Sequence, residues 1–228
     1  MKDKMNKIHN IDCLEFMKTV PDNYFDLTLT DIPYNECDIE NNGIWDKNTN
    51  MKDMGQADDF SNINMQELLT QFDRTCKGSF YIFCGIEQIS EIRKFFRQKK
   101  YTTRLIIWEK TNPMPINGQY VFLSGIEACV WAKKPSATFN ENCRNTVFKY
   151  PLGIDRTEHP TTKPLRLFEE FIKISTNEGD KVCDWFMGSG TTAKAAKALR
   201  REFCGTEIKK EYCDLSDDRL KEVQGSLF

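Results

Sequence analysis

The sequence lacks the residue spacings that are typical of metal centres and disulfide frameworks. Only two histidines occur, His9 and His159, and they lie far apart in the chain. The nine cysteines stand singly, with no C-x-x-C pair. Neither a zinc site nor a disulfide framework is indicated, so we predict no bound metal. Cysteines inside apolar runs, such as Cys84 and Cys129, are instead expected to be buried free thiols of a protein from the reducing cytoplasm.

A long hydrophobic run is also missing. No apolar stretch approaches the about 18–20 residues that span a bilayer, and the opening MKDKMNKIHN lacks the apolar core of a signal peptide. Hydrophobic residues make up 39% and charged residues 29% of the 228 positions. These values favour a globular protein without a membrane partner, with one domain over 1–228. The stretch 35–62 has no clear period and is predicted to be a flexible loop.

Positive charge is not in excess, because the net charge is −2. A nucleic-acid partner is therefore not indicated by the total. The distribution is uneven, however, since residues 133–166 contain seven Lys and Arg against three acidic residues. A second basic cluster extends from Arg93 to Arg104. Such clusters are usually solvated faces, but they permit a phosphate-binding surface.

Hydrophobic periodicity predicts strands that alternate with helices. Apolar or alternating runs predict strands at 7–12, 25–31, 78–85, 102–110, 126–133, 181–186 and 202–207. Helical spacing predicts helices at 13–19, 64–76, 89–99, 164–176, 191–201 and 209–223. The segment 134–163 is expected to be irregular and basic. The alternation predicts an α/β fold with a single doubly wound, mostly parallel sheet.

A glycine-rich loop near the C-terminus lies between a predicted strand and a predicted helix. In VCDWFMGSGTTAKAAKALRREFCGTE (182–207), Gly188, Gly190 and Ala193 fit G-x-G-x-x-A. Glu207 ends the following strand, 19 residues after Gly188. Glycines allow close approach of a ligand, and an acid about 20 residues later suits ribose hydroxyls. This context favours a cofactor site over a simple tight turn.

Asp184, just before this loop, discriminates between cofactors that contain ribose. A carboxylate there disfavours the pyrophosphate of NAD. S-adenosylmethionine carries a sulfonium and an α-ammonium in place of phosphates. Asp184 can accept hydrogen bonds from the ammonium, directly or through water. The charge therefore favours S-adenosylmethionine.

The stretch TLTDIPYNE (28–36) ends a predicted strand with a carboxylate, a stiff corner and an aromatic ring. Asp31 is expected at the carboxyl end of its strand, where open α/β sheets bind ligands. Pro33 fixes its own φ and biases Ile32 towards an extended backbone. A carboxylate and a carbonyl can hold one exocyclic –NH2, and the ring of Tyr34 can stack on a flat base. Next to an S-adenosylmethionine site, this corner would hold an amino group facing a methyl donor.

These motifs together resemble those of the amino-methyltransferases of DNA, which modify adenine N6 or cytosine N4. That family's hallmark, Asp/Ser/Asn-Pro-Pro-Tyr, is similar to Asp31-Ile32-Pro33-Tyr34. Further matches are 12–31, IIWEKTNPMP (106–115) and HPTTKP (159–164). The catalytic motif precedes the cofactor loop, as in the permuted β group. The resemblance implies a circularly permuted, Rossmann-like S-adenosylmethionine-dependent methyltransferase fold.

The resemblance also implies roles for the matched residues. The Asp31 side chain and the Ile32 carbonyl would hold the target amino group of an extruded base, and Tyr34 would stack on that base. Asp12 would lie near the cofactor adenine, and Lys163, with Thr161 and Thr162, would line the cofactor or target cleft. The residues implied at the cofactor are Asp12, Lys163, Asp184, Phe186, Gly188, Ser189, Gly190, Thr191, Thr192 and Glu207.

The chain departs from the family pattern at Ile32, where the family usually has Pro. The backbone carbonyl is kept and the corner gains an N–H, so we expect activity to be kept. Asp31 in the first place favours adenine N6, since cytosine enzymes more often carry Ser. Cytosine N4 of DNA, an RNA base and a protein amide stay open as alternatives.

DNA contacts are expected from a short recognition segment at about 134–157. Phosphate contacts are predicted for Lys133, Lys134, Arg144 and Lys149. Members of the group are often dimers, and a homodimer would widen this small footprint. No motif specifies a recognition sequence or a restriction endonuclease partner.

Two interpretations of another class were compared with this one. A catalytically inactive nucleic-acid-binding module that retains the fold stays open, and binding of S-adenosylmethionine would discriminate against it. An NAD oxidoreductase is disfavoured by Asp184 and leaves the corner from Asp31 to Tyr34 without a role.

Overall fold

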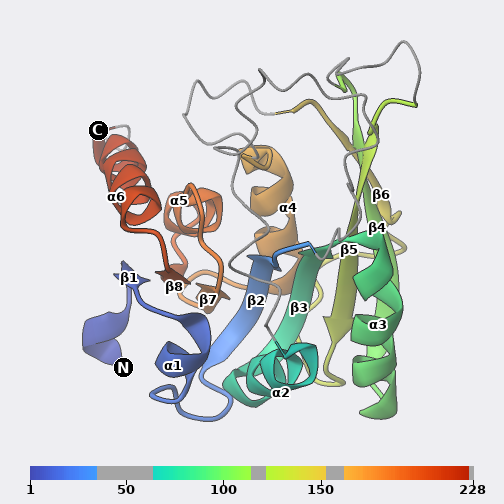
Figure 1. Ribbon diagram of the computed structural model, residues 1–228, viewed down its shortest axis with the longest axis horizontal. Coiled ribbons are helices and arrows are strands. Elements are labelled where there is room, and N and C mark those ends of the chain that lie inside the picture. The colour runs from blue at the N-terminus through green and yellow to red at the C-terminus, as the bar shows by residue number, and fades with distance from the viewer. Residues whose placement is uncertain (35–63, 114–121, 153–161, 226–228) are drawn as a thin grey trace, which may run out of the picture.

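The computed structural model describes residues 1–34, 64–113, 122–152 and 162–225, and it confirms the predicted α/β fold (Figure 1). The predicted loop at 35–62 and residues 153–157 of the predicted recognition segment lie outside this part. The strands are β1 (Lys7–Asn10), β2 (Phe25–Asp31), β3 (Cys76–Cys84), β4 (Thr102–Lys110), β5 (Ile126–Lys133), β6 (Val147–Tyr150), β7 (Lys181–Asp184) and β8 (Glu202–Glu207). The helices are α1 (Cys13–Met17), α2 (Met65–Thr75), α3 (Ile89–Gln98), α4 (Leu165–Ser175), α5 (Thr191–Ala198) and α6 (Lys210–Gly225), with 3-10 turns η1 (Lys2–Lys4) and η4 (Ile86–Gln88).

The described strands form one mixed sheet in the order β1-β8-β7-β2-β3-β5-β4-β6. Every neighbouring pair is parallel except the two pairs that involve β5, which runs against its neighbours β3 and β4. The carboxyl ends of the other strands and the amino end of β5 therefore share one edge. We call this edge the site edge, because Asp31, Asp184 and Glu207 all end strands there.

Helices cover both faces of the sheet. One apolar cluster contains side chains of α1, α2 and α3, such as Phe16, Leu69 and Phe96. The other contains side chains of α4, α5 and α6, such as Phe171 and Leu220. Figure 1 shows the two helix groups on opposite sides of the strands. The sheet is thus doubly wound, as the alternation of strands and helices predicts.

Strand β6 corrects the expectation that 134–163 is irregular. Residues Val147–Tyr150 pair in parallel with the end of β4. Phe148 is buried, and the Trp108 indole N–H donates to the Tyr150 carbonyl over 2.9 Å. The strand has only four residues and one neighbour, so its alternation is too short to separate it from a loop.

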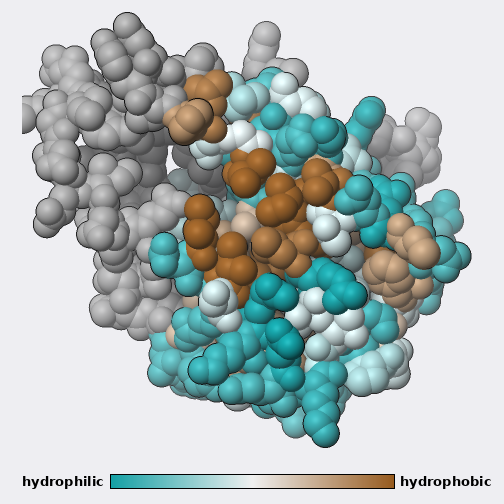
Figure 2. All heavy atoms as spheres, turned by 90° about the vertical axis from the view of Figure 1, so that its right-hand side faces the viewer, coloured by the Kyte–Doolittle hydropathy of each residue, from teal (hydrophilic) through white to brown (hydrophobic). Residues whose placement is uncertain are grey.

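An apolar strip remains on the α3 face of the sheet. In Figure 2, hydrophobic residues gather on the side of the molecule where α3 and strands β4 to β6 lie. Register places Ile107 beside Ala128 and Val147, and Ile126 and Val147 are exposed. The described helices therefore leave part of this face uncovered.

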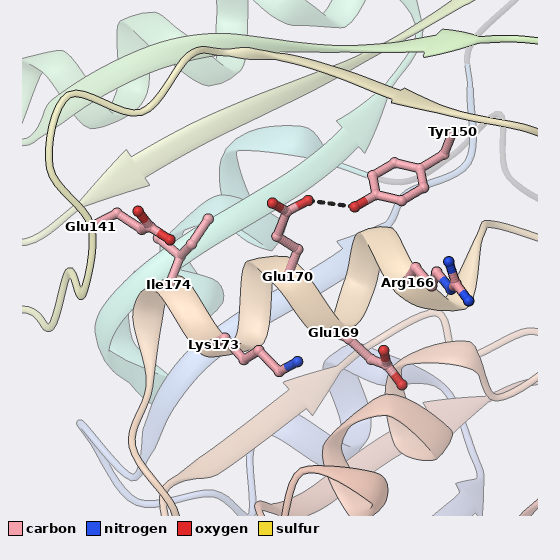
Figure 3. A pocket seen from close by; sticks show the side chains of 7 residues that line it. All are labelled: Glu141, Tyr150, Arg166, Glu169, Glu170, Lys173 and Ile174. Carbon is pink, nitrogen blue, oxygen red and sulfur yellow. Dashed lines mark hydrogen bonds between the residues drawn. The ribbon is translucent and has the colours of Figure 1, made fainter.

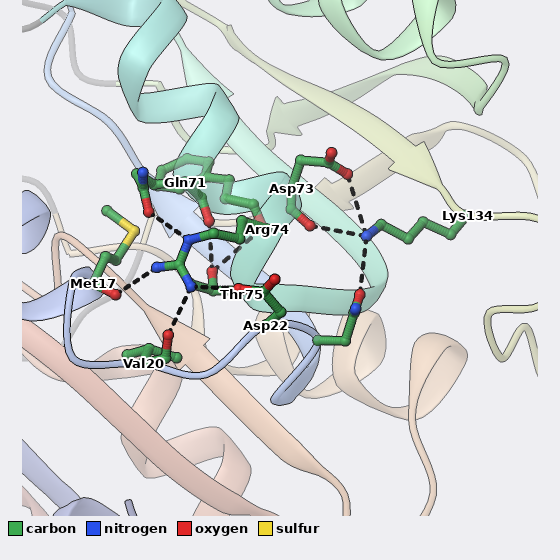
Figure 4. A network of polar contacts seen from close by, with 10 residues as sticks. Met17, Val20, Asp22, Gln71, Asp73, Arg74, Thr75 and Lys134 are labelled. Atoms are coloured by element: carbon green, nitrogen blue, oxygen red, sulfur yellow. Dashed lines mark hydrogen bonds and ion pairs between the residues drawn. The ribbon is translucent and has the colours of Figure 1, made fainter.

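Arg74 of α2 fastens the connection between α1 and β2 (Figure 4). Its guanidinium donates to the carbonyls of Met17 (2.6 Å) and Val20 (2.7 Å) and to the carboxylate of Asp22 (2.8 Å). Carbonyls at the end of a helix lack hydrogen-bond donors within the helix, and the guanidinium of Arg74 provides these donors. This network fixes the entry into β2, the strand that ends at Asp31.

Candidate active site

Asp31 is positioned by the alternation of β2. Leu27 and Leu29 belong to the apolar cluster on the α4 face, so Asp31, two residues further, points to the same side. Its Oδ2 accepts a hydrogen bond from Lys163 Nζ over 2.5 Å. Its Oδ1 is buried and has no hydrogen-bond partner among the described residues. A buried acceptor without a partner is rare and marks a place where a donor can bind.

The corner after Asp31 is fixed on both sides. The Ile32 side chain is 2% exposed and joins the cluster of α1 to α3, while its N–H donates to the Phe83 carbonyl over 3.1 Å. The Pro33 carbonyl accepts from Gln88 Nε2 (2.9 Å), and Gln88 Oε1 accepts from the Gly85 N–H (2.8 Å). The N–H that Ile32 adds to the family pattern is thus used to extend the β2–β3 pairing.

Tyr34 lies beside the carboxylate of Asp31, where its ring is partly buried. Its hydroxyl donates to Glu127 Oε2 over 3.5 Å, and Lys163 Nζ lies 5.7 Å from its ring centroid. Burial, together with the negative charges of Asp31 and Glu127, raises the pKa of Tyr34 well above its ordinary value. The ring is therefore a neutral phenol, which suits stacking.

Lys163 lies between Asp31 at the end of β2 and Glu127 in β5. Its side chain is 7% exposed, and its ammonium contacts Asp31 Oδ2 (2.5 Å) and Glu127 Oε2 (2.9 Å). Burial alone would lower the pKa of Lys163, but the charges and hydrogen bonds of the two carboxylates outweigh it and raise that pKa above its ordinary value. Lys163 therefore stays protonated and cannot act as a general base.

Two further charged residues escaped sequence reasoning. Glu127 of β5 accepts from Lys110 Nζ through Oε1 (2.9 Å) as well as from Lys163. Burial opposes ionisation of Glu127, but Lys163 and Lys110 together lower its pKa. The sequence does contain a sign of this role. Glu127 is an acid in an otherwise apolar strand, and it lies on the same face as Cys129 and Trp131, which are buried.

The cofactor half of the site centres on Asp184 at the end of β7. Its Oδ1 accepts from the Thr30 hydroxyl (2.8 Å) and the Phe186 N–H (3.1 Å), and its Oδ2 from the Thr192 hydroxyl (2.5 Å). Burial raises the pKa of Asp184 to about 6, although these three hydrogen bonds oppose the rise. A carboxylate offers about four acceptor sites, so one site on Oδ2 remains for a further donor.

The glycine loop is held from two directions. Glu207 Oε2 accepts from the Gly188 N–H over 2.9 Å, and its Oε1 accepts from the Lys209 N–H over 2.9 Å. The Ser216 hydroxyl of α6 donates to the Gly188 carbonyl over 2.7 Å. Gly190 has φ +80°, and a Cβ there would lie 2.8 Å from Ser216 Cβ. Both conformation and space therefore require glycine at this position.

The other predicted cofactor residues lie around this loop or at the neighbouring strand. Thr191 and Thr192 begin α5 and are buried, as is Ser189, whereas Phe186 is half-buried. Asp12 follows β1, which pairs with β8, and caps α1 by accepting from the Glu15 N–H over 3.0 Å. The structure thus gathers these residues at the site edge, while Thr161 lies outside the described part.

The two halves of the site are directly connected. Thr30, the neighbour of Asp31, donates its hydroxyl to Asp184, and Thr162 donates to the Ser189 hydroxyl over 3.4 Å. Strands β2 and β7 pair side by side, which brings positions about 150 residues apart to one edge. The carboxylates of Asp184, Glu207 and Asp12 can accept hydrogen bonds from the ammonium and ribose hydroxyls of S-adenosylmethionine. This set of acceptors therefore fits that cofactor.

The four basic residues predicted at DNA phosphates do not lie together. Because β5 is antiparallel, Lys133 pairs with Ser79 and Thr102 at the edge opposite to the site. Lys134 follows there and donates to the Asp73 carbonyl over 2.8 Å (Figure 4). Arg144 pairs with Glu170 of α4. Lys149 differs, since it lies near the end of β6 at the site edge, is 65% exposed, and pairs with Glu109.

A surface pocket lies on the outer side of α4 (Figure 3). Tyr150 donates to Glu170 across it over 2.7 Å. Its lining residues are Glu141, Tyr150, Arg166, Glu169, Glu170, Lys173 and Ile174. None of these is a predicted site residue, so the pocket is separate from the site of Asp31.

Within 1–34, 64–113, 122–152 and 162–225, no group of three or more His, Cys, Asp or Glu is arranged to hold a metal ion. Among the helices of this part, none has the length and apolar character needed to cross a membrane.

Comparisons with known proteins agree with this geometry. A family model described as DNA methylase of the N6/N4 type matches residues 129–218. The type II methyltransferase M.HpaI of Haemophilus parainfluenzae is 30% identical over 241 residues, covering 92% of this chain and 72% of that protein. M.HinfI of Haemophilus influenzae is 29% identical over 255 residues, covering 98% and 70%. The crystal structure of an M1.HpyAVI–SAM complex is similar with a TM-score of 0.70 and 30% identity, covering 94% of this chain and 98% of that one.

Proposed function

Since this chain belongs to the N6/N4 family of S-adenosylmethionine-dependent DNA methyltransferases, we propose that the base it modifies is adenine, at N6. The predicted membership of the N6/N4 family and the predicted cofactor, S-adenosylmethionine, are thus confirmed. The observation that carries amino-group methylation is the buried Oδ1 of Asp31, which has no partner among the described residues and would suit the amino group of adenine or of cytosine. It can accept one N–H of an exocyclic amino group. Asp in this first position favours adenine.

The proposed mechanism begins with extrusion of the base, because its amino nitrogen is inaccessible inside the duplex. Tyr34 then provides the neutral face on which the base stacks. Asp31 Oδ1 and the Ile32 carbonyl each accept one N–H of the amino group. Holding both N–H bonds directs the nitrogen lone pair towards the cofactor half of the site, whose link to the target half is the hydrogen bond from Thr30 to Asp184.

The cofactor, when bound, supplies an electrophilic methyl group on a sulfonium. Asp184, Glu207 and the glycine loop would hold it. As the nitrogen formed its bond to the methyl carbon, the methyl–sulfonium bond would break and leave a neutral thioether. The carboxylate of Asp31 would stabilise the positive charge on the amino nitrogen until one N–H proton passes to solvent. The transfer needs no protein nucleophile, which agrees with the burial of seven of the eight cysteines in the described part.

Modified bases in host DNA test the proposal. We expect DNA from a host that expresses the protein to contain N6-methyladenine at one recurring sequence, and sequencing of modified bases measures it. The Asp31→Ala variant should lose the signal by about 1,000-fold or more, because both the acceptor and its charge are removed. N4-methylcytosine in the digested DNA would support the second candidate, cytosine N4. Methylation that persists in Asp31→Ala would contradict the assigned role of Asp31.

A further inference from the structure

Four charged side chains form an alternating array at the site edge. Lys110 Nζ lies 2.9 Å from Glu127 Oε1, Lys163 Nζ lies 2.9 Å from Glu127 Oε2, and Lys163 Nζ lies 2.5 Å from Asp31 Oδ2. The four residues come from the end of β4, the start of β5, the segment before α4 and the end of β2. We call this set the charge array. Its last atom is Oδ1 of Asp31, for which the described part of the chain provides no hydrogen-bond partner.

Stability alone is a weak reason for such an array. The side chains of Lys163, Lys110, Glu127 and Asp31 are 7%, 11%, 18% and 29% exposed. Removing charges from water carries a desolvation penalty that the pairing only balances, and apolar residues of similar size often serve as well. The formal charges of the two lysines and the two acidic residues cancel, so the array has no net charge. Such an array suits the orientation of the Asp31 carboxylate better than it suits stabilisation of the fold.

The geometry explains what is oriented. A carboxylate is planar, so fixing Oδ2 of Asp31 leaves only rotation about that contact to place Oδ1. Lys163 fixes Oδ2, and Glu127 holds the ammonium of Lys163 from the other side. Lys110 takes the second oxygen of Glu127, which prevents that side chain from turning away. Each contact therefore restricts the rotation of the next side chain in the array, and the last one restricted is Asp31 with its Oδ1.

We propose that Glu127 and Lys110 are positioning residues for methyl transfer, which act through Lys163 to aim Oδ1 of Asp31 at the target amino group. The inference rests on the proposed function, in which Oδ1 accepts an N–H of the base. Glu127 and Lys110 do not touch the reacting atoms. Through Lys163, their effect is on the rate of transfer once the base is in place. Glu127 Oε2 also accepts from the Tyr34 hydroxyl over 3.5 Å, whereas Lys110 contacts the other oxygen of Glu127, so K110M tests this route without removing the contact to Tyr34.

The chain contains a matched control at the opposite edge of the sheet. Asp73 also bridges two lysines, Lys99 (2.9 Å) and Lys134 (3.2 Å), and its side chain is 16% exposed. As with Glu127, burial opposes ionisation of Asp73 but its partners lower the pKa. Asp73 also accepts from the Tyr101 hydroxyl over 2.8 Å, much as Glu127 accepts from Tyr34, but neither its lysines nor Tyr101 is a residue of the candidate site. Asp73→Asn therefore reproduces the charge loss without touching the site.

The experiment compares E127Q, K110M and D73N with the wild type on DNA that contains a mapped methylation site. Single-turnover transfer of labelled methyl groups measures the rate, and 2-aminopurine at the target position reports base extrusion. We expect E127Q to slow transfer about 10- to 100-fold and K110M about 3- to 10-fold, because small misplacements are amplified in the rate. KM for DNA and the 2-aminopurine signal should stay within about twofold of the wild type. D73N should lower the unfolding midpoint as E127Q does, yet keep its rate within about twofold.

The outcomes separate the possibilities. Equal rates for E127Q and D73N would overturn the inference, as would a loss in E127Q that appears in KM and base extrusion instead of the rate. If E127Q does not fold, K110M decides, and a wild-type rate in K110M overturns the inference. A wild type that binds S-adenosylmethionine but methylates no DNA would overturn the proposed function and this inference together.

Discussion

Ile32 shows how one residue can leave a family pattern and still fit its position. A proline has no N–H and could not donate to the Phe83 carbonyl, nor would it fill the apolar space that Ile32 occupies at 2% exposure. The residue therefore contributes to the fold on one side, through its N–H and side chain. On the other side only its carbonyl is needed for the proposed chemistry.

The substitution Ile32→Pro separates these contributions. We expect it to lower the free energy of unfolding by about 2–3 kcal/mol, because a buried carbonyl loses its donor and apolar volume is lost. Methylation per folded molecule should stay within about threefold of the wild type, since the carbonyl remains. Thermal unfolding and a methylation assay at low temperature measure the two effects. Ile32→Val, which keeps the N–H, should cost only about 1 kcal/mol, and a larger loss of activity than of stability in Ile32→Pro would contradict this account.

Asp184 makes cofactor binding depend on pH. Its pKa of about 6 in the folded protein lies above the ordinary value for an aspartate, because the side chain is buried. A raised pKa means that protonation stabilises the fold. This contribution is complete below the unfolded pKa of about 4 and is lost as the pH rises through about 6. The cofactor ammonium, in contrast, requires the ionised carboxylate.

Affinity for S-adenosylmethionine should therefore fall as the pH falls below about 6, by up to tenfold per pH unit. Calorimetric titration from pH 5 to 7 measures the trend, in a range where the cofactor ammonium itself stays protonated. Asp184→Asn should bind about tenfold or more weakly at pH 7 and show no such trend. Its free energy of unfolding at pH 7 should not fall below that of the wild type, because the buried charge is gone. A wild-type trend in the variant would exclude Asp184 as the titrating group.

At the scale of elements, the turn from β7 into α5 could be predicted because everything it needs is local. Gly188, Gly190 and Glu207 fall within 20 consecutive residues, and their spacing carries the signal. What the spacing does not contain is the support from α6. Ser216 reaches the loop across helix packing, and its contact with the loop depends on how α5 and α6 cross.

Gly190→Ala tests this turn, and Gly179→Ala is its control. Both glycines have positive φ, +80° and +84°, but a Cβ at Gly179 meets nothing within 4 Å, whereas at Gly190 it meets Ser216. The backbone strain of about 1–2 kcal/mol is common to both variants. Gly190→Ala should in addition weaken S-adenosylmethionine binding by about tenfold, because the loop must shift. Calorimetry measures the affinity, and equal affinities in the two variants would argue against a role for the loop's shape.

The sequence predicts the ends of β2, β7 and β8 as the site, but not the contribution of β5. Glu127 appears in the sequence as one acid within IEACVWAK. Its partners Lys110 and Lys163 are 17 and 36 residues away, and only strand register and the placement of α4 bring them together. β6 was missed for a related reason, because a four-residue edge strand is defined by its pairing partner rather than by its own pattern.

At the scale of the whole molecule, strand direction decides which basic residues can reach DNA. A sequence cluster suggests that Lys133, Lys134 and Lys149 act together. The antiparallel β5 carries Lys133 and Lys134 to the edge opposite to Asp31, where Lys134 is held by Asp73. Only Lys149 of these three lies at the site edge. Composition can locate charge along the chain, but not on the surface.

Salt dependence of DNA binding tests this placement. Lys149→Gln should reduce the slope of log K against log salt by about 0.9, the value for one phosphate contact, while Lys133→Gln should leave the slope unchanged. Fluorescence anisotropy with a duplex at several salt concentrations measures both slopes. Neutral glutamine is used because a glutamate at 149 would face Glu109. Equal slopes for the two variants would remove Lys149 from the proposed DNA contacts.

The strand order β1-β8-β7-β2 has a consequence for folding during translation. β1 and β2 are neighbours in sequence, yet they are separated in the sheet by β7 and β8, which are made after all the other described strands. The first strand therefore has no described pairing partner until residues 202–207 have been translated. Asp31 can pair with Lys163 only after that lysine has been translated. The proposed cofactor site likewise requires that Asp184 and Glu207 have been translated. The candidate site is therefore complete only after residues 202–207 have been translated and β8 has paired with β1.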